Sequence, residues 1–274
     1  MGSRQRVVLV TGASSGLGEA ISHLLAQEGF RVFGTYLPGS LDIPVVTGVE
    51  PIELDVDSEE SVEHCVDHVR SRAGRIDILV NNAGIMQFGF AEETTMEKAH
   101  AVFQTNFFGA VRMINAVLPE MRSRRQGRIV NIGSLAAWVG EPGEAFYSAS
   151  KRSLASYTET LHHEVWPLGV HVSLVEPGAF KTGILRAALT NSNTIADYDA
   201  SRESAAKTLR VALKRGHDPR RLAHLILKIV DSPSPRLRYG AGLEAHLLPY
   251  LKVLVPQRLF DRIIRRAYGL TKKR

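Results

Sequence analysis

A tyrosine and a lysine four residues apart, Tyr147 and Lys151, have the clearest potential for chemistry in this sequence. If the segment is helical, positions i and i+4 share a face, so both side chains can reach one point. A free tyrosine has a pKa of about 10, but a neighbouring ammonium stabilises the phenolate and lowers that pKa. Tyr147 is therefore predicted to exchange a proton with an alcohol or a carbonyl group. The spacing alone is common, so the prediction depends on the surrounding sequence.

A glycine-rich stretch reads TGASSGLG from Thr11 to Gly18, between an apolar run (Arg6 to Val10) and a helical pattern that stops at Gly29. A strand, a tight glycine turn and a helix N-terminus together suit a phosphate group. The spacing is G-x-x-x-G-x-G without a following Gly-Lys-Ser/Thr, which excludes the phosphate loop of kinases and NTPases. The alternative is an ordinary glycine-rich connection.

The second predicted strand, Arg31 to Tyr36, indicates which dinucleotide would bind. A cofactor with a free ribose 2′-hydroxyl usually meets an acidic residue at the end of this strand. Here the strand ends in Tyr36 and Leu37, and the first acid is Asp42. Without a carboxylate to repel a 2′-phosphate, NADP(H) is favoured over NAD(H). NAD(H) stays possible, because no arginine is present there either.

Strands alternate with helices along the chain, which predicts a parallel sheet covered on both faces. The fold class is therefore α/β: a single Rossmann-type doubly wound parallel sheet of about seven strands with a C-terminal helical extension. Residues 1–274 are expected to form one domain. The first six strands are predicted at 6–10, 31–36, 52–54, 76–80, 128–132 and 170–175, and the long helices after the first one at 58–69, 96–121 and 145–167.

Three further stretches lie where side chains could enter a site at the carboxyl edge of that sheet. Asn81-Asn82-Ala83-Gly84 follows the fourth strand and either admits a flat ring or is an amide-rich turn. Asn106 lies within a predicted helix, where it either bends or hydrates the helix at a functional site or faces solvent. Ser134 follows the fifth strand outside a G-x-S-x-G context, so a hydrolase elbow is not supported. The loop at Glu141-Pro142-Gly143 could return Ser134 to Tyr147.

Composition excludes several classes of protein. The single cysteine, Cys65, lies in an apolar helical stripe and is predicted to be a buried thiol in a reducing compartment. The apolar run at the N-terminus is too short for a signal peptide. No apolar run of 18 residues exists, so no transmembrane helix is expected. A cytoplasmic protein is therefore predicted. The adjacent His162 and His163 point about 100° apart on a helix, so no metal site is predicted there.

The net charge of +6 is concentrated in the tail, since residues 250–274 contain eight Lys/Arg and one acid. The remaining chain is near neutral and gives no reason to expect nucleic acid. The tail has apolar residues in helical register rather than aromatic stacking platforms, which also disfavours a nucleic-acid binder.

Taken together in this order, the motifs TGASSGLG, Asp55, NNAG, Asn106, Ser134, YSASK and PG resemble the short-chain dehydrogenase/reductase family over roughly residues 6–182. A looser echo at Arg236–Gly240 would be a seventh strand. The resemblance implies hydride transfer between a nicotinamide cofactor and an alcohol or carbonyl substrate, with the cofactor supplying the hydride. It also implies a homodimer or homotetramer.

The resemblance assigns roles to individual residues. Tyr147 would be the general acid/base, Lys151 would hold the nicotinamide ribose, Ser134 would bind the substrate oxygen, and Asn106 would position a water for proton relay. The other residues that would bind the cofactor are Gly12, Ser14, Ser15, Gly16, Leu17, Gly18, Tyr36, Asp55, Val56, Asn82, Ala83, Gly84, Pro177, Gly178, Phe180 and Thr182.

Two regions are expected to set the substrate. Residues 183–235 are predicted to form a mobile lid that orders on binding, with breaks at 191–193 and 197–199. Trp138, Phe146, Ile184 and Leu185 suggest an apolar pocket, which favours a lipophilic alcohol or ketone.

Residues 245–274 form a basic amphipathic extension. Its apolar face either packs on the body or on a second subunit, or contacts an anionic membrane surface. Relatives acting on retinoids, steroids or acyl-lipid ketones have such tails. The alternative function is an inactive dinucleotide-binding sensor or scaffold, although such proteins usually lack the tyrosine or lysine.

Overall fold

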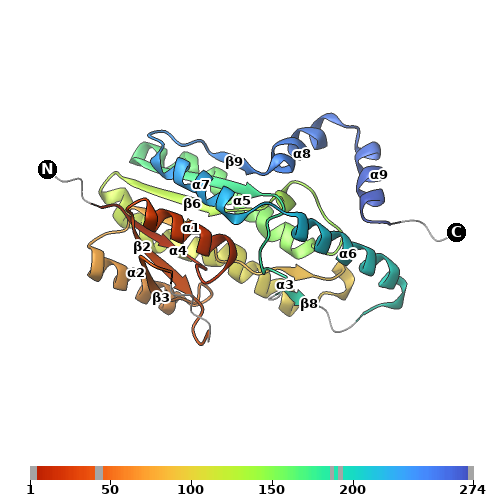
Figure 1. Ribbon diagram of the computed structural model, residues 1–274, viewed down its shortest axis with the longest axis horizontal. Helices are drawn as coiled ribbons and strands as arrows, with labels where there is room; N and C mark the ends of the chain where they lie inside the picture. Colours follow the sequence, from red (N-terminus) through yellow and green to blue (C-terminus); the bar gives the residue numbers. More distant parts are fainter. Residues whose placement is uncertain (1–4, 41–45, 186–187, 191–193, 271–274) are drawn as a thin grey trace.

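The computed structural model describes residues 5–40, 46–185, 188–190 and 194–270. Seven parallel strands build the main sheet, and their carboxyl ends all meet at one edge (Figure 1). The predicted fold class is confirmed. In spatial order the strands are β3 (Val49–Glu53), β2 (Arg31–Tyr36), β1 (Val7–Val10), β4 (Ile78–Asn81), β6 (Gly127–Ile132), β7 (Val170–Pro177) and β9 (Arg238–Ala241).

Each strand predicted from the sequence has a counterpart in this sheet, with shifted ends. The strand order reverses between β1 and β4, because β2 and β3 extend the sheet on one side and the later strands extend it on the other. Such a switch point opens a crevice at the carboxyl edge, where ligands bind in open α/β sheets. The register places Val10 beside Gly34 on one side and beside Val80 on the other.

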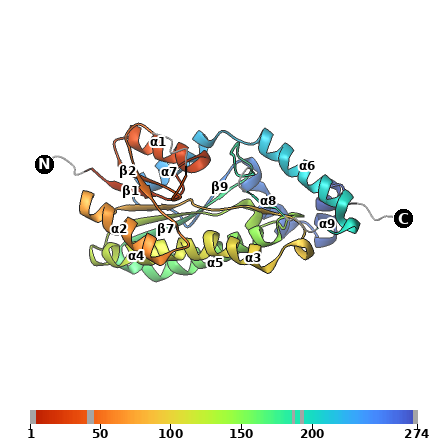
Figure 2. The same cartoon turned by 90° about the horizontal axis from the view of Figure 1, so that it is seen from below.

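Helices cover both faces of the sheet, as Figure 2 shows. One layer packs α1 and α7 on the sheet, and the opposite layer is formed by α2, α4 and α5. The residues of β1 alternate between them: Val8 and Val10 pack toward α1 and α7, and Leu9 packs toward the other layer. The helices are α1 (Gly16–Gln27), α2 (Glu59–Ala73), α3 (Met96–Phe103), α4 (Ala110–Ser123), α5 (Ala145–Val165), α6 (Asp199–Arg215), α7 (Pro219–Asp231), α8 (Leu243–Leu254) and α9 (Gln257–Ala267).

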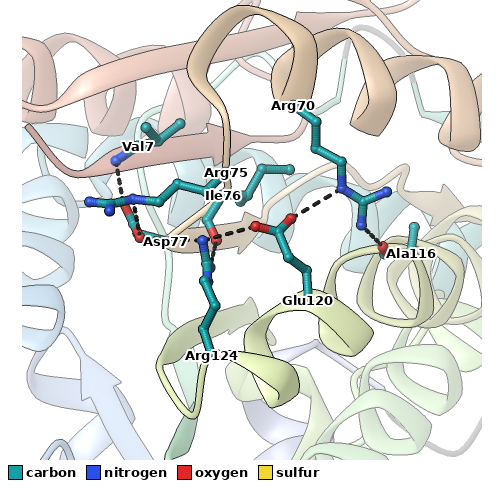
Figure 3. Close-up of polar contacts among 8 residues, drawn as sticks. All are labelled: Val7, Arg70, Arg75, Ile76, Asp77, Ala116, Glu120 and Arg124. Carbon is teal, nitrogen blue, oxygen red and sulfur yellow. Dashed lines mark hydrogen bonds and ion pairs between the residues drawn. The ribbon is translucent and has the colours of Figure 1, made fainter.

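The amino edge of the sheet, opposite the crevice, is tied together by charged side chains (Figure 3). Asp77, just before β4, accepts a hydrogen bond from the Val7 backbone N–H at 2.9 Å and pairs with Arg75 at 2.9 Å. Glu120 on α4 pairs with Arg124 at 2.9 Å and with Arg70 on α2 at 3.1 Å. These contacts join α2 and α4 to the sheet at the end that carries no predicted site residue.

The long helix predicted at 96–121 is interrupted. A π-helical turn, Gln104–Gly109, separates α3 from α4, and Asn106 is buried within it at 1% exposure. The alternative that Asn106 faces solvent is therefore wrong, and the alternative that it bends or hydrates the helix at a functional site stays a prediction. π-Bulges of this kind often occur at functional sites.

Two features of the substrate region were not anticipated. A small parallel pair joins β5 (Gln87–Phe88) to β8 (Leu189–Thr190) beside the main sheet. The predicted break at 197–199 falls where 196–198 form a short 3₁₀ turn, but it ends one residue earlier than predicted, because Asp199 begins α6. The predicted break at 191–193 lies outside the described residues.

The C-terminal extension folds back over the carboxyl edge, where α9 lies beside α6 in both views. The Ser204 hydroxyl on α6 donates to the Tyr268 carbonyl at 2.6 Å, and Phe260 is buried. No described helix combines the length and the apolarity needed to cross a bilayer. Cys65 is buried as predicted, and burial raises the pKa of its thiol to about 12.

Candidate active site

One cavity of about 460 Å³ at the carboxyl edge brings most of the predicted site residues together. It extends from the glycine turn after β1, past the tyrosine–lysine pair on α5, to α6 and α8. Fifteen predicted residues line it: Gly12, Ser14, Ser15, Gly16, Leu17, Asn82, Ala83, Gly84, Ser134, Tyr147, Lys151, Pro177, Gly178, Phe180 and Thr182.

Five predicted residues do not line this cavity. Gly18 lies behind the glycine turn, where a Cβ atom would come 2.1 Å from the Gly12 carbonyl oxygen. Tyr36 ends β2, and Asp55 is engaged locally by the Asp57 backbone N–H at 2.9 Å. Val56 is buried against Gly109, and Asn106 lies one layer deeper than the cavity wall. Gly18, Val56 and Asn106 therefore shape the site from behind.

The glycine turn is fastened to the end of β4. The Thr11 hydroxyl accepts hydrogen bonds from the backbone N–H groups of Asn82 and Ala83, both at 3.0 Å. The Asn82 side-chain amide donates to the carbonyls of Thr11 and Gly12, both at 2.9 Å. Gly12 and Gly16 have backbone φ values of 66° and 61°, which residues that carry a Cβ atom rarely adopt.

The N-terminus of α1 faces this turn with its backbone donors free of a side-chain cap. Ser15 occupies the capping position in extended conformation, but its side chain makes no capping hydrogen bond. The first N–H groups of a helix need a partner, and together with the helix dipole they favour an anion. This end of the cavity is thus chemically suited to a pyrophosphate.

Tyr147 and Lys151 lie one helical turn apart on α5, and both are buried. The Lys151 ammonium donates to the carbonyl of Ile132, the last residue of β6, at 2.9 Å. The Tyr147 phenol is hydrogen-bonded to Ser134, which itself accepts from the Ala136 backbone N–H at 3.1 Å. Gly84 lies opposite the lysine, and a Cβ atom there would be 3.5 Å from Nζ.

The expectation that Lys151 lowers the pKa of Tyr147 is not met in this environment. Burial raises the pKa of Tyr147, and the carboxyl groups of Glu144 and Glu141 raise it further, whereas the Ser134 hydrogen bond lowers it. Burial also lowers the pKa of Lys151 to about 8, so the ammonium stays mostly charged at neutral pH and begins to lose its proton just above it. The phenol is accordingly held in its neutral, proton-donating form.

Asn106 connects the π-helical turn to the loop after β4 and to α5. Its amide donates to the Ile85 carbonyl at 2.9 Å and to the Ser150 hydroxyl at 3.1 Å, and its oxygen accepts from the Ile85 N–H at 2.8 Å. Ser150 in turn donates to the Tyr147 carbonyl at 2.8 Å. Asn106 therefore fixes the backbone on both sides of the cavity.

The far half of the cavity contains residues that sequence reasoning missed. Glu141 and Glu144 line it from the loop before α5, and Tyr268 reaches it from the C-terminus. The only signal for the glutamates was their place between Ser134 and Tyr147, and no pattern pointed to Tyr268. Apolar residues complete this half: Met86, Ile184, Leu209, Leu213 and Leu248.

Of the four apolar residues expected in a pocket, only Ile184 lines this cavity. Leu185 packs against the same apolar cluster from outside. The Trp138 indole instead donates to Glu176 at 2.8 Å, away from the cavity. Within the described residues, no group of three His, Cys, Asp or Glu side chains could hold a metal ion.

Comparisons with known proteins agree with this geometry. Residues 6–193 match the family model described as short chain dehydrogenase. The chain is 37% identical over 273 residues to the 3-ketodihydrosphingosine reductase of Bacteroides thetaiotaomicron, an alignment that spans 97% of this chain and 98% of that protein. The chain belongs to the short-chain dehydrogenase/reductase family.

Other relatives of this short-chain dehydrogenase/reductase include retinol dehydrogenase 8 of Bos taurus, 32% identical over 93% of this chain and 88% of that protein. A short-chain dehydrogenase from Streptomyces avermitilis superposes with a TM-score of 0.83 at 32% identity, covering 99% of this chain and 100% of that one.

Two similar solved structures are complexes with a dinucleotide. A Burkholderia phymatum enzyme bound to NAD has a TM-score of 0.80 at 26% identity, covering 97% of this chain and 96% of that one. A Burkholderia cenocepacia enzyme bound to NADP has a TM-score of 0.75 at 26% identity, covering 99% and 100%. The protein is a dinucleotide-dependent oxidoreductase, and the uncapped α1 terminus and the glycine turn fit such a cofactor.

The pKa of Lys151 makes stability depend on pH. An unfolded lysine has a pKa near 10.5, and burial lowers it to about 8 in the folded protein. The unfolded chain binds more protons between these values, so stability should rise with pH across this window. Relative to Lys151→Met, the free energy of unfolding of the unmodified protein should increase by about 1 kcal/mol per pH unit from pH 8 to 9.5.

Urea denaturation of both proteins at several pH values measures this difference. Lys228→Met, which removes an exposed lysine from α7, serves as the control and should show no pH-dependent difference. If the difference in free energy of unfolding between Lys151→Met and the unmodified protein did not change with pH, the lysine would have its ordinary pKa.

Proposed function

We propose that the protein interconverts an alcohol and a ketone or aldehyde, with Tyr147 as the general acid/base. The observation that carries the proposal is that Tyr147, Ser134 and Lys151 line the same cavity as the glycine turn. When bound, the dinucleotide supplies the hydride. The protein supplies orientation and the proton.

Each polar residue then has a defined task. Tyr147 donates its phenolic proton to the carbonyl oxygen, and its raised pKa keeps that proton in place until it is needed. The Ser134 hydroxyl, hydrogen-bonded to Tyr147, lies where it can share the same substrate oxygen. Lys151 would hold the nicotinamide ribose, with its ammonium already oriented by the Ile132 carbonyl. Asn106 would act as a positioning residue for the proton path beside Lys151.

The substrate is proposed to be lipophilic. The far half of the cavity is lined mainly by aliphatic side chains from α6 and α8, among them Leu209, Leu213 and Leu248. Two relatives are named for lipid-like substrates, 3-ketodihydrosphingosine and retinol. The region 183–235 would cover the substrate as a lid, although 186–187 and 191–193 lie outside the described residues.

NADP(H) is proposed as the preferred cofactor. Tyr36 ends β2, and Leu37 beside it is 59% exposed, so the described end of this strand presents no carboxylate to repel a 2′-phosphate. Asp42 lies outside the described residues. Asp55 and Val56 would border the adenine from the loop after β3.

We also propose that the C-terminal extension contacts an anionic membrane surface. Val253 and Leu254 at the end of α8 are 77% and 78% exposed, and Leu259 and Ile263 on α9 are exposed as well. Arginines of α9 flank this apolar face, and positive charge complements anionic lipid headgroups. The protein would then be cytoplasmic and peripherally membrane-associated, and the family resemblance predicts a homodimer or homotetramer. The inactive-scaffold alternative is disfavoured, because Tyr147, Lys151, Ser134 and Asn106 are all retained.

Tyr147→Phe should reduce turnover by about 10²–10⁴-fold, because it removes the proton donor while the aromatic ring stays in place. Steady-state reduction of a lipophilic ketone with NADPH measures this loss. Tyr157→Phe is the matched control, since Tyr157 lies on the same helix and packs against Phe107 rather than in the cavity. Near-normal turnover in Tyr147→Phe would refute the assignment.

Tyr36→Asp should shift cofactor preference toward NAD(H). An added carboxylate at the end of β2 would repel a 2′-phosphate and accept a hydrogen bond from a free 2′-hydroxyl. Calorimetric titration should show NADPH binding weakened by roughly tenfold or more, since one carboxylate–phosphate repulsion at this range is worth about 1–2 kcal/mol, with NADH binding unchanged or tighter. If Tyr36→Asp changed the binding of NADPH and of NADH equally, the ribose 2′ position of the cofactor would not lie beside Tyr36.

Arg265→Gln combined with Arg266→Gln should weaken binding to vesicles that contain phosphatidylserine. Each basic residue near an anionic surface contributes about 1 kcal/mol, so two should matter roughly tenfold or more. Arg122→Gln combined with Lys228→Gln removes two exposed charges elsewhere and should have no effect. If the unmodified protein ignores vesicles at low salt and instead self-associates, the apolar face is an interface between copies.

A further inference from the structure

Three glutamates line the cavity, and none of the steps above uses them. Glu244 on α8 is already engaged by the Ala179 backbone N–H and by His217, both at 3.1 Å, which leaves Glu141 and Glu144 to be explained. Glu144 immediately precedes α5, three residues before Tyr147, and Glu141 lies in the loop before it. Both line the cavity. Both are near enough to the phenol for their charges to raise its pKa.

The two carboxyl groups differ in how they are partnered. Glu141 accepts a hydrogen bond from the Tyr268 hydroxyl at 2.6 Å. Glu144 is 3% exposed, and its Oε1 has no hydrogen-bond partner among the described residues. Leaving a buried polar oxygen without a partner is costly. An unpartnered carboxyl oxygen on the wall of a substrate cavity therefore points to a donor that arrives with the substrate.

The charges around the cavity select the type of donor. Burial and the neighbouring Glu141 carboxyl raise the pKa of Glu144, because two close carboxyl groups resist sharing negative charge. Lys151 is the one Lys or Arg among the described lining residues, and its ammonium is directed at the Ile132 carbonyl. A cation on the substrate would meet two carboxyl groups, of which Glu141 already accepts from Tyr268 and Glu144 has an unpartnered Oε1, and it would relieve their repulsion.

We propose that Glu144, with Glu141 beside it, binds a protonated amine on the substrate, and that the preferred substrate is a long-chain amino ketone. The proposal rests on reduction at Tyr147. Because Glu144 and Tyr147 line the same cavity and the Glu144 charge acts on the phenol, an amine held by Glu144 lies near the carbonyl group that Tyr147 protonates. The aliphatic residues of α6 and α8 then hold the hydrocarbon chain.

The reaction leaves the amine unchanged. The carbonyl carbon accepts the hydride, the carbonyl oxygen accepts the proton of Tyr147, and the products are an amino alcohol and the oxidised dinucleotide. The ammonium keeps its own proton and its contact with the carboxyl groups. It also offsets the negative charges that oppose ionisation of Tyr147, so proton donation is easier when an amine is bound.

The first test compares two substrates of equal chain length, a 2-amino-3-ketone and the 3-ketone without the amine. The unmodified protein should prefer the amino ketone in kcat/KM, and Glu144→Gln should reduce that preference by about 10- to 100-fold, the range for a hydrogen bond to a charged group. Glu63→Gln, at an exposed position on α2, is the control and should keep the preference. A preference absent from the unmodified protein, or unchanged in Glu144→Gln, would overturn the proposal.

A second test needs no turnover. Calorimetry should detect binding of a long-chain 2-amino alcohol to the protein, weaker binding of the same alcohol without the amine, and loss of the difference in Glu144→Gln. The comparison of ligands on unmodified protein stands even if the variant does not fold, which thermal melting would reveal. Amine-dependent binding without ketone reduction would refute the proposed function but keep this site. Reduction of both ketones at equal efficiency, with no amine-dependent binding, would support the proposed function but refute the amine site.

Discussion

The site depends on one contact, the hydrogen bond that the buried ammonium of Lys151 makes. Its hydrogen bond to the Ile132 carbonyl ties α5 to the carboxyl end of β6 at the place where the cavity opens. A lysine with so little exposure gives up much of its solvation, and the lowered pKa of about 8 is the consequence. Burial in the cavity thus brings the pKa of the lysine close to neutral pH.

A second set of buried polar contacts fixes the same helix further along. Asn81 at the end of β4 donates to Asn131 on β6 at 2.9 Å, and Asn131 donates to the Thr158 hydroxyl on α5 at 2.9 Å. Together with Asn106, these side chains connect two strands, a π-helical turn and α5 without exposing a polar group to water. These hydrogen bonds hold α5 against the sheet, and within the network the Asn81 Oδ1 atom is left without a hydrogen-bond partner among the described residues.

The sequence predicted the sheet, its helices and most of the cavity wall, because hydrophobic period and glycine spacing are local signals. It could not predict how Asn106 is accommodated, since a π-helical turn has no pattern of its own. It also gave the wrong direction for the pKa of Tyr147. The Tyr147–Lys151 spacing was visible, but the depth of burial and the approach of Glu141 and Glu144 are tertiary properties. Tyr268 was missed for the same reason, as it meets Glu141 across 127 positions of chain.

That contact between Tyr268 and Glu141 has a consequence for how the protein can diversify. Tyr147, Ser134 and Lys151 all lie before residue 183, whereas part of the wall of the same cavity is contributed by Tyr268, near the opposite end of the chain. Changes confined to the segment that follows α9 can therefore reshape the cavity while those three residues stay unchanged. This part of the cavity wall is encoded far from the tyrosine, the serine and the lysine, so its sequence can change independently of theirs.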